Sequence, residues 1–209
     1  MKSLSHPNII QIKEFIEDPD LSYHILIFEY FDAITLKEFI LLNEYKNEDF
    51  SIIFAQIYGG LLYLHEKKIL HRDFNINNIL INVQSLDIKI IDFGLARHIM
   101  HIQYMLSPHG NFQYRSPNFE TLVNPFFEDV WNFAAVGLSL LKRKKMTSKK
   151  VQRLLESFQK NPAEFEECEK EITRILVFLQ NAINEACDDK EDCQMMELKS
   201  PLEKYKIMF

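Results

Sequence analysis

The residues with the clearest chemical meaning are two aspartates and an asparagine in one short stretch of the chain. They occur as His71-Arg72-Asp73, then Asn78, then Asp92-Phe93-Gly94. Carboxylate and amide oxygens are the ligands that Mg²⁺ prefers in proteins, and a carboxylate can also accept a proton from a reacting hydroxyl group. These residue types therefore predict a site that binds a divalent cation and moves a proton, provided that the fold brings the three side chains together.

A β-hairpin is predicted between Asn78 and Asp92. Strand-like alternation runs through 79–83 and 87–91, and Gln84-Ser85-Leu86 separates the two runs. A hairpin returns the chain to the edge where it began, so Asp92 would lie beside Asn78. Gly94 is expected to let the backbone turn sharply after Asp92.

Together these residues resemble the catalytic loop and the metal-binding turn of eukaryotic protein kinases. At a background frequency of about five per cent per fixed residue, the seven matching positions would recur by chance about once in a billion starts. The resemblance implies that Asp73 accepts the proton of the substrate hydroxyl, and that Asn78 and Asp92 ligate the Mg²⁺ that holds the phosphates of ATP. It also implies that Arg72 binds a phosphate on the activation segment, with Ser107 as the candidate acceptor.

The same resemblance implies the nucleotide-binding residues. Phe28-Glu29-Tyr30-Phe31 matches the hinge, where the backbones of Glu29 and Phe31 would hydrogen-bond adenine and Phe28 would be the gatekeeper. Leu80 matches the residue that packs under adenine. Three members of the family's internal hydrophobic spine are matched by Ile12, His71 and Phe93. The implied cofactors are ATP and Mg²⁺. Residues 28–31 could instead be the ordinary buried end of a strand.

Several family features are missing or replaced. The glycine-rich loop, the strand Lys and the helix Glu that pairs with it would precede His6-Pro7-Asn8, so Met1 marks either a truncation or a mispredicted start. Asn75 stands where serine/threonine kinases have a Lys, and Asn111 where they have a Thr. A positive charge lost near the γ-phosphate is expected to cost on the order of a few kcal/mol of transition-state stabilisation, unless these two amides hydrogen-bond each other.

Two further replacements compensate each other in this interpretation. Asn118 replaces the Glu of the family's Ala-Pro-Glu motif, and Cys193 falls at the position of its Arg partner. Breaking a buried ion pair by losing one member costs roughly 3 to 5 kcal/mol, whereas losing both can be nearly neutral. Glu120 is an alternative replacement for the Glu. Asp129 matches a scaffold residue that accepts backbone N–H bonds from the catalytic loop.

The expected fold is α+β and mostly α. A helical large lobe would carry the catalytic-loop and metal-loop hairpin, and two strands, 10–17 and 22–28, would remain of the small lobe. We expect a single partial kinase domain with a small-lobe remnant in 1–28, a hinge in 29–34, a large-lobe core in 35–141 and a divergent helical part in 142–209.

Helices are predicted from caps and apolar periodicity. Thr35 would cap a short helix over 36–42, and 48–66 and 163–187 show amphipathic patterns. The last of these would either cover the lobe or dock a partner. The apolar run 133–141 is too short to span a bilayer and predicts a core helix.

Composition and charge limit the function classes. The 209 residues are 47% hydrophobic, enough for a sizeable core, and no apolar signal region is evident. Three cysteines are too few for a disulfide framework, which predicts a cytoplasmic or nuclear protein. A net charge of −6 gives no footprint for nucleic acid, and we expect no membrane partner. His98 and His101 have no evident third ligand for a metal.

The basic run 142–145, with Lys149 and Lys150, has two interpretations. It is most simply a solvated helix end whose cations favour the helix dipole, and the alternative is a nuclear-localisation or docking patch.

The resemblance therefore implies a kinase that transfers the γ-phosphoryl group of ATP to Ser or Thr of a protein substrate. Tyr114-Arg115-Ser116-Pro117 is similar to that branch of the family, whereas residues 74–77 fit neither branch. The competing class is a pseudokinase, a scaffold that binds proteins through its helical lobe. A regulatory protein on this lobe is a further candidate partner.

Overall fold

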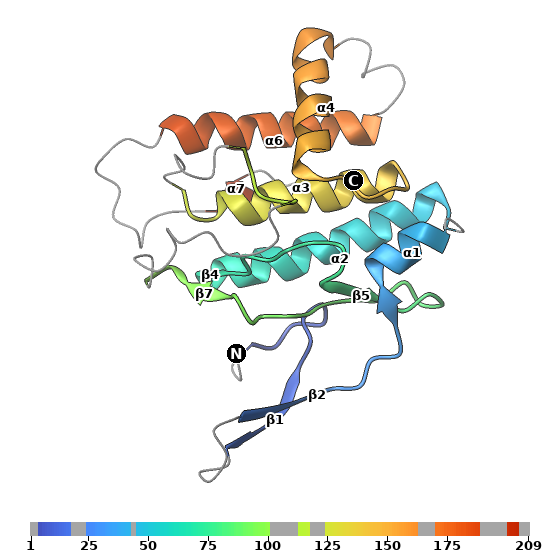
Figure 1. Ribbon diagram of the computed structural model, residues 1–209, viewed down its shortest axis with the longest axis vertical. Coiled ribbons are helices and arrows are strands. Elements are labelled where there is room, and N and C mark those ends of the chain that lie inside the picture. The colour runs from blue at the N-terminus through green and yellow to red at the C-terminus, as the bar shows by residue number, and fades with distance from the viewer. Residues whose placement is uncertain are drawn as a thin grey trace.

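A stack of helices forms most of the protein, and a two-stranded hairpin projects from one end of it (Figure 1). The computed structural model describes residues 4–17, 24–42, 45–100, 113–117, 124–162, 170–188 and 200–204. The strands are β1 (Ile12–Glu17), β2 (His24–Phe28), β3 (Ile34–Thr35), β4 (Ile69–Leu70), β5 (Ile79–Ile81), β6 (Ile88–Ile90) and β7 (Arg97–His98). The helices are α1 (Leu36–Leu42), α2 (Asn47–Glu66), α3 (Phe127–Leu141), α4 (Ser148–Lys160), α6 (Lys170–Asp188) and α7 (Pro201–Lys204). The predicted mostly helical α+β fold is confirmed.

Some predictions fall outside the described residues. They concern Met1, the proposed phosphate acceptor Ser107 and the substrate-loop residue Asn111. They also concern Asn118 and Glu120, the two candidates for the place of the Glu in the Ala-Pro-Glu motif, together with His101, Cys168 and Cys193.

The predicted helix at 36–42 is confirmed, and its N-terminus is a capping box. Glu38 N donates to Thr35 Oγ1 at 3.2 Å, and Thr35 N donates to Glu38 Oε2 at 2.8 Å. Such reciprocal bonds satisfy backbone donors that a helix terminus otherwise leaves unpaired. α2 begins one residue before the predicted position, and its apolar side chains are fully buried at Ile53, Phe54, Ile57, Leu61 and Leu64.

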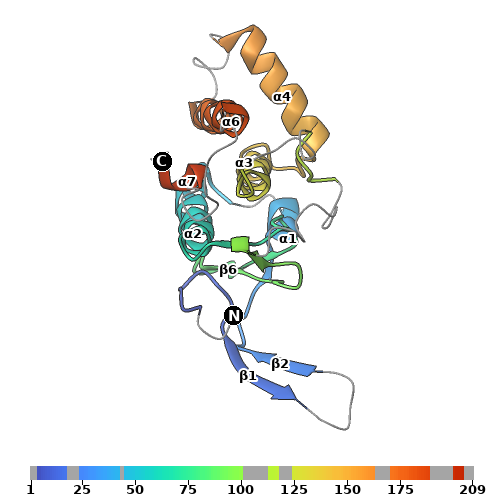
Figure 2. The ribbon, with the colours of Figure 1, turned by 90° about the vertical axis from the view of Figure 1, so that its left-hand side faces the viewer.

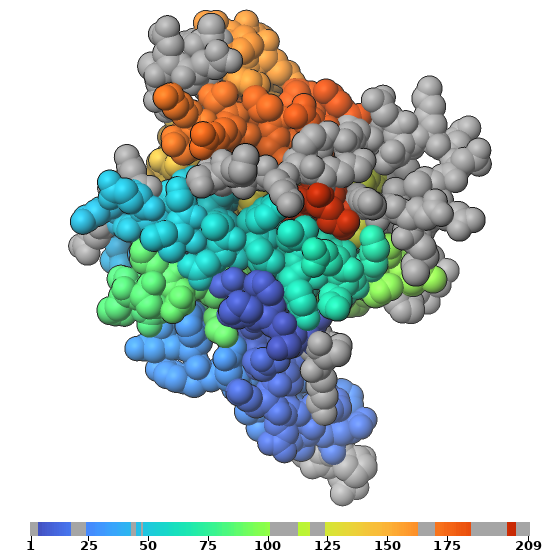
Figure 3. Space-filling model, turned by 180° about the vertical axis from the view of Figure 1, so that it is seen from behind, coloured from blue at the N-terminus to red at the C-terminus, as the bar shows by residue number. Residues whose placement is uncertain are grey.

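The predicted hairpin of 79–91 is also confirmed, and it belongs to a three-stranded sheet. β5 pairs antiparallel with β6, and β3 joins β5 on its other edge. Asn82 Oδ1 accepts hydrogen bonds from Gln84 N at 3.0 Å and Ser85 N at 2.9 Å, which forms the turn. The N-terminal segment reaches this sheet, because Ile10 N donates to Ile90 O at 3.0 Å. Figure 3 shows that segment, in dark blue, lying against α2.

α3 is the central helix, and α2 and α6 pack on it (Figure 2). Most of its residues are buried, from Phe127 through Leu140. Gly137 permits the close approach of its neighbours, because a Cβ there would lie 2.5 Å from a Phe54 ring carbon and 2.8 Å from Ile175 Cδ1. On α6, the described apolar face covers α3, which confirms the first of the two roles predicted for this helix.

α4 was not predicted, and its presence corrects part of the interpretation of the basic run. Residues 142–145 do follow the C-terminus of α3, where cations are favourable. Lys149 and Lys150, however, lie in the first turn of α4, where the helix dipole disfavours positive charge. α4 is held by the buried side chains Val151, Leu155 and Phe158.

The β1–β2 hairpin presents apolar side chains to solvent on both faces. Phe15, Ile16 and the β2 residues 25–28 are between 37% and 47% exposed. Within the described residues these strands pair only with each other, so the two predicted strands form a separate hairpin. Among the described helices none is long and apolar enough to cross a membrane.

Candidate active site

The catalytic loop is anchored to α3 by Asp129. The fully buried carboxylate accepts hydrogen bonds from His71 N at 2.7 Å and Arg72 N at 2.9 Å, as predicted. Burial alone would raise the pKa of Asp129, but the hydrogen bonds from His65 and His71 lower this pKa on balance. Arg72 has a left-handed backbone with φ of 67°, which costs roughly 1–2 kcal/mol for a residue with a side chain. The bonds to Asp129 hold it there.

Asp73 and Asn78 lie side by side in this loop. Asn78 Nδ2 donates to the carbonyl oxygen and to Oδ2 of Asp73, both at 2.8 Å. Because the amide nitrogen is bonded to Asp73, the amide oxygen is the atom of Asn78 that can ligate a cation. The structure therefore brings the predicted base and one predicted metal ligand together.

Asn75 is buried and bonds within the same loop. Its Nδ2 donates to Asp73 O at 2.9 Å and to Asp73 Oδ1 at 3.2 Å. Its Oδ1 accepts from Asn77 N at 2.9 Å and Asn77 Nδ2 at 2.7 Å. Both carboxylate oxygens of Asp73 thus accept a neutral amide N–H. The expected pairing of Asn75 with Asn111 stays a prediction, since Asn111 lies outside the described residues.

Two hydrogen bonds join the Asp92 turn to the catalytic loop. His71 Nε2 lies 2.9 Å from Ile91 O, and Ile91 N donates to Asn78 O at 3.0 Å. The His71 and Phe93 rings also contact each other, with centroids 5.0 Å apart. His71 and Phe93, two of the three predicted spine residues, are therefore in contact. Ile12, the third, lies opposite Phe28 in the β1–β2 hairpin. Ile91, the residue directly before Asp92, is therefore hydrogen-bonded to both His71 and Asn78 of the catalytic loop.

The sharp turn after the hairpin is made by Asp92 and not, as predicted, by Gly94. Asp92 has φ of 61° and an exposed side chain; aspartate tolerates this left-handed region better than most residues. Gly94 instead allows a close approach, because its N donates to Asp92 Oδ1 at 3.3 Å and a Cβ would lie 3.3 Å from the same oxygen.

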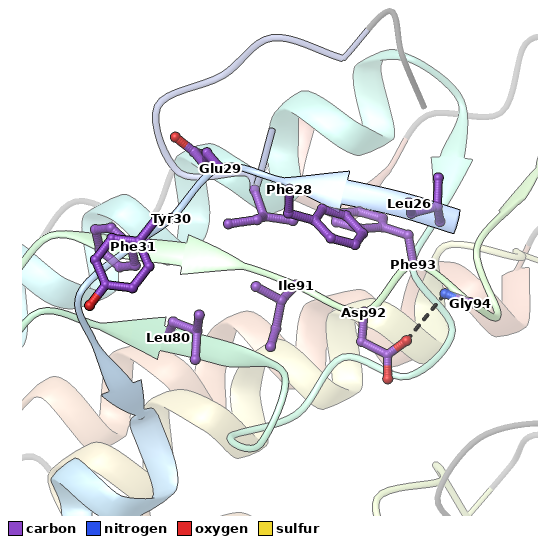
Figure 4. Close-up of a pocket in the computed structure, with 11 residues that line it drawn as sticks. Leu26, Phe28, Glu29, Tyr30, Phe31, Leu80, Ile91, Asp92, Phe93 and Gly94 are labelled. Carbon is purple, nitrogen blue, oxygen red and sulfur yellow. Dashed lines mark hydrogen bonds between the residues drawn. The ribbon is translucent and has the colours of Figure 1, made fainter. Parts of the chain in front are cut away.

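A cavity of about 580 Å³ opens beside Asp92. In Figure 4, Leu26 and Phe28 of β2 lie on one side, Leu80 and Ile91 lie on the other, and the Asp92 carboxylate lies at one end. The lining consists of Ile10, Leu26, Phe28, Glu29, Tyr30, Phe31, Leu80, Ile91, Asp92, Phe93 and Gly94. The predicted nucleotide residues are thus brought to one cavity.

The hinge backbone leaves hydrogen-bonding groups for a ligand in this cavity. Glu29 N donates to Gln11 O at 2.9 Å. Among the hydrogen bonds between described residues, none uses the Glu29 carbonyl or the Phe31 N–H. An apolar slot edged by one acceptor and one donor fits a purine ring, and this fit supports the predicted adenine site.

The Glu29 side chain has a separate role that the sequence did not reveal. It points away from the cavity in Figure 4 and forms an ion pair with Lys89 of β6, with Nζ 2.7 Å from Oε1. Oε1 also accepts from Gln11 N at 2.9 Å. Partial burial would raise the pKa of Glu29, but the Lys89 and Gln11 hydrogen bonds lower it on balance. Lys89 thereby ties the hinge to the catalytic hairpin.

Among the described residues that line the cavity, only Glu29 and Asp92 are charged, and both are acidic. Because the Glu29 side chain is paired with Lys89, the unpaired charge at the cavity is that of Asp92. The described residues contain no cluster of three His, Cys, Asp or Glu side chains suited to a metal ion. The predicted ligand set is instead one carboxylate and one amide, a donor set of hard oxygens that fits Mg²⁺ when phosphate oxygens and water complete the shell.

The segment 113–117 lies against the base and the start of α3. Tyr114 is buried, and burial together with the nearby charge of Asp73 raises its pKa to about 12. Ser116 N donates to Glu128 Oε1 at 3.0 Å. Burial raises the pKa of Glu128. Sequence analysis had missed Glu128, although an acidic residue directly before Asp129 in an apolar run was a visible signal.

A second cation lies near the predicted phosphate-binding Arg72. Burial lowers the pKa of Arg72, and the charge of Arg97 in β7 lowers it further. Two guanidinium groups in proximity form a favourable site for a doubly charged anion. The predicted acceptor Ser107 lies outside the described residues, so this role of Arg72 stays a prediction.

Comparison with known proteins identifies the class to which this fold and site belong. Residues 1–193 match the family described as Protein kinase domain. The chain therefore belongs to the protein kinase family, as the resemblance implied.

The individual proteins that this chain is similar to are named as kinases. The chain is 33% identical over 137 residues to the serine/threonine-protein kinase ppk25 of Schizosaccharomyces pombe, covering 64% of this chain and 32% of that protein. It is 34% identical over 151 residues to mitogen-activated protein kinase 5 of Arabidopsis thaliana, covering 68% and 39%. It is 32% identical over 149 residues to a probable casein kinase II subunit alpha homolog of Encephalitozoon cuniculi, covering 69% and 46%. The aligned part thus spans less than half of each of these relatives.

Proposed function

We propose that this protein transfers the γ-phosphoryl group of ATP to a Ser or Thr hydroxyl of a protein substrate. The observation that supports this most directly is the pair of 2.8 Å hydrogen bonds from Asn78 Nδ2 to Asp73, in a loop bonded to the residue before Asp92. Base, amide ligand and carboxylate ligand are connected by a short network beside a cavity with the size and lining for adenine.

The residues divide the work as follows. Asp73 accepts the hydrogen bond of the substrate hydroxyl and takes its proton as the new bond forms. Asn78 Oδ1 and the Asp92 carboxylate hold Mg²⁺, which supplies the positive charge that offsets the phosphates. The hinge backbone at Glu29 and Phe31 orients the adenine, while Phe28 and Leu80 exclude water from its faces. Asn75 keeps the Asp73 carboxylate oriented through its 3.2 Å bond to Oδ1.

A second candidate function follows from the charge of the cavity. The described part of its lining contains two acidic residues and no cation, and Asn75 is neutral where the family has a Lys. With no fixed positive charge in this lining, stabilisation of the phosphates rests largely on the metal. We therefore also propose a pseudokinase alternative, in which the fold serves as a protein-binding scaffold and transfers phosphate slowly or not at all.

The division of the chain, the partners and the compartment are parts of the same proposal. We assign residues 1–28 to a small-lobe remnant, 29–34 to the hinge, 35–141 to the large-lobe core and 142–209 to a divergent helical part. The proposed partners are a protein substrate and a regulatory protein on the large lobe, in the cytoplasm or the nucleus. The compartment stays a prediction from cysteine usage alone.

Ligand-induced stabilisation and phosphate transfer, measured side by side, test the proposal. MgATP at a hundredfold over its dissociation constant should stabilise the fold by about 2.7 kcal/mol, and radiolabelled phosphate should appear on a generic Ser/Thr protein substrate. Asp92→Ala should abolish the transfer and reduce the stabilisation to the level that ATP gives without Mg²⁺. Asp73→Asn should retain the stabilisation and lose the transfer, because the base makes no contact with the adenine or the metal in this assignment.

Asp87→Asn is the matched control, since Asp87 is an exposed aspartate in the hairpin turn. It should leave both measurements unchanged. Stabilisation by MgATP without transfer, in wild type and in Asp73→Asn alike, would favour the scaffold. Absence of both effects in the wild-type chain would refute a nucleotide-dependent function for this protein as it stands.

A further inference from the structure

A buried hydrogen bond joins the C-terminal segment to the helix that precedes the catalytic loop. Ser200 Oγ lies 2.6 Å from His65 Nδ1 in α2, and both residues are fully buried. Ser200 also starts α7, because Leu202 N donates to its Oγ at 3.2 Å and Ser200 N donates to Glu203 Oε1 at 3.3 Å. α7 packs on α2 and α3, as Figure 2 shows.

The other nitrogen of His65 extends this contact to the catalytic loop. His65 Nε2 lies 3.1 Å from Asp129 Oδ2, the same oxygen that accepts the His71 N–H at 2.7 Å. A carboxylate only accepts, so Nε2 carries a proton. In the neutral imidazole Nδ1 then accepts the Ser200 hydroxyl.

All the bonds therefore run in one direction. The Ser200 hydroxyl donates to His65, and His65 donates to Asp129. The backbone N–H groups of His71 and Arg72 meet at the same carboxylate. Consecutive bonds of this kind polarise one another in a low-dielectric interior. Removing the hydroxyl would leave Nδ1 of a fully buried ring without this partner, which favours a shift of the ring away from its present position beside Asp129.

We propose that Ser200 is a positioning residue for the catalytic loop, acting through His65 and Asp129 on the backbone of His71 and Arg72. The residue touches neither substrate nor cofactor in the proposed site. Its effect is to fix the ring that helps orient the Asp129 carboxylate, and hence the left-handed Arg72 that directly precedes the base. The effect on turnover rests on the proposed function; the effect on the loop does not.

A second anchor of the same segment provides a matched control. Tyr58 Oη donates to Leu202 O at 2.9 Å, which also fastens α7 to α2. The Tyr58 hydroxyl bonds to the backbone of Leu202 and not to the side chain of Ser200 or His65. Tyr58→Phe and Ser200→Ala therefore each remove one hydroxyl that holds α7, and only Ser200→Ala interrupts the route to Asp129.

Amide hydrogen exchange of the full chain, followed by NMR, tests the proposal without any activity. Ser200→Ala should speed exchange of the His71 and Arg72 amides by roughly tenfold, the factor expected for one lost buried hydrogen bond. The amides of α1, which lies outside this network, report global stability and should change less. In a His65→Phe background, whose ring offers the Ser200 hydroxyl no nitrogen acceptor, Ser200→Ala should add nothing at the His71 and Arg72 amides.

Equal changes in Ser200→Ala and Tyr58→Phe, or changes at His71 and Arg72 no larger than those in α1, would overturn the proposal. So would an additive effect of Ser200→Ala in the His65→Phe background. If the wild-type chain transfers phosphate, Ser200→Ala should lower kcat and leave the KM for ATP unchanged, because the adenine cavity is untouched. If no transfer occurs, the proposed function fails, and the exchange data still decide the role of Ser200.

Discussion

The most informative stability prediction concerns Asp129→Asn. The carboxylate accepts three hydrogen bonds, from His71 N, Arg72 N and His65, at 2.7, 2.9 and 3.1 Å. An asparagine offers one oxygen, so its NH₂ group must face at least one buried N–H. Leaving such a donor unpaired costs about 1–3 kcal/mol, and bonds to a charged acceptor are worth about 1.5–3 kcal/mol each. We expect Asp129→Asn to lower the free energy of unfolding by about 3 kcal/mol.

Urea unfolding monitored through Trp131, which is buried in the same helix, measures this difference. Asp87→Asn makes the same chemical change at an exposed site and should cost less than about 0.5 kcal/mol. The pKa of Asp129 is lowered in the fold from its ordinary 3.8. Its contribution is therefore present above that ordinary value and is lost as the pH falls through the lowered pKa. The gap between wild type and Asp129→Asn should thus be constant near neutral pH and shrink in acid. A loss below about 1 kcal/mol at pH 7 would refute the reasoning that these bonds support the loop.

Three more predictions follow from named contacts. Because the described residues of the cavity lining include no cation, adenosine should bind at least as tightly as ATP in EDTA, and Mg²⁺ should strengthen only ATP binding. Calorimetric titration in both conditions checks this, and tight metal-free ATP binding would contradict it. Lys89→Met should lower the free energy of unfolding by about 1–2 kcal/mol at pH 7, with exposed Lys37→Met as control. Because the pKa of Glu29 is lowered, this loss should fade in urea titrations as the pH falls below that pKa. Gly137→Ala should cost about 1–3 kcal/mol through overpacking. Gly59→Ala should be neutral or stabilising by up to about 1 kcal/mol, because its Cβ would meet only His6 atoms at 3.9 and 4.0 Å; equal thermal shifts for the two variants would contradict the packing argument.

Elements whose signals are local were predictable from the sequence. Thr35 and Glu38 form a capping box within four residues of each other, so the start of α1 could be read directly. The hairpin of β5 and β6 likewise follows from alternation around a polar turn. α4 was missed although its buried residues Val151, Leu155 and Phe158 have helical spacing. The lysines at its start continue the preceding basic run in the sequence, which conceals the break between the two helices.

The proposed catalytic and metal-binding residues were predictable, because their residue types and their spacing together form a recognisable pattern. The residues that hold them in position were not predictable. The partner of Glu29 is a lysine on another strand, and the partner of His65 is 135 residues away in the chain. Neither contact has a local sequence signal, since each depends on how α7, α2 and the sheet pack. The position of the left-handed turn at Asp92 shows the same limit. Glycine was the natural expectation, but the hydrogen bonds on either side of Ile91 decide which residue turns.

The charge distribution around Asp73 connects the two candidate functions. In this loop, neutral amides bond both carboxylate oxygens, and the cavity beside it is lined by acidic and apolar residues. In this interpretation the positive charge that phosphoryl transfer needs must enter largely with the metal. On this proposal, such a site would bind an adenine ring through the hinge even when no phosphate is held productively. Nucleotide binding and phosphate transfer would then be separable, and the comparison of adenosine with ATP, with and without Mg²⁺, measures how far they have separated.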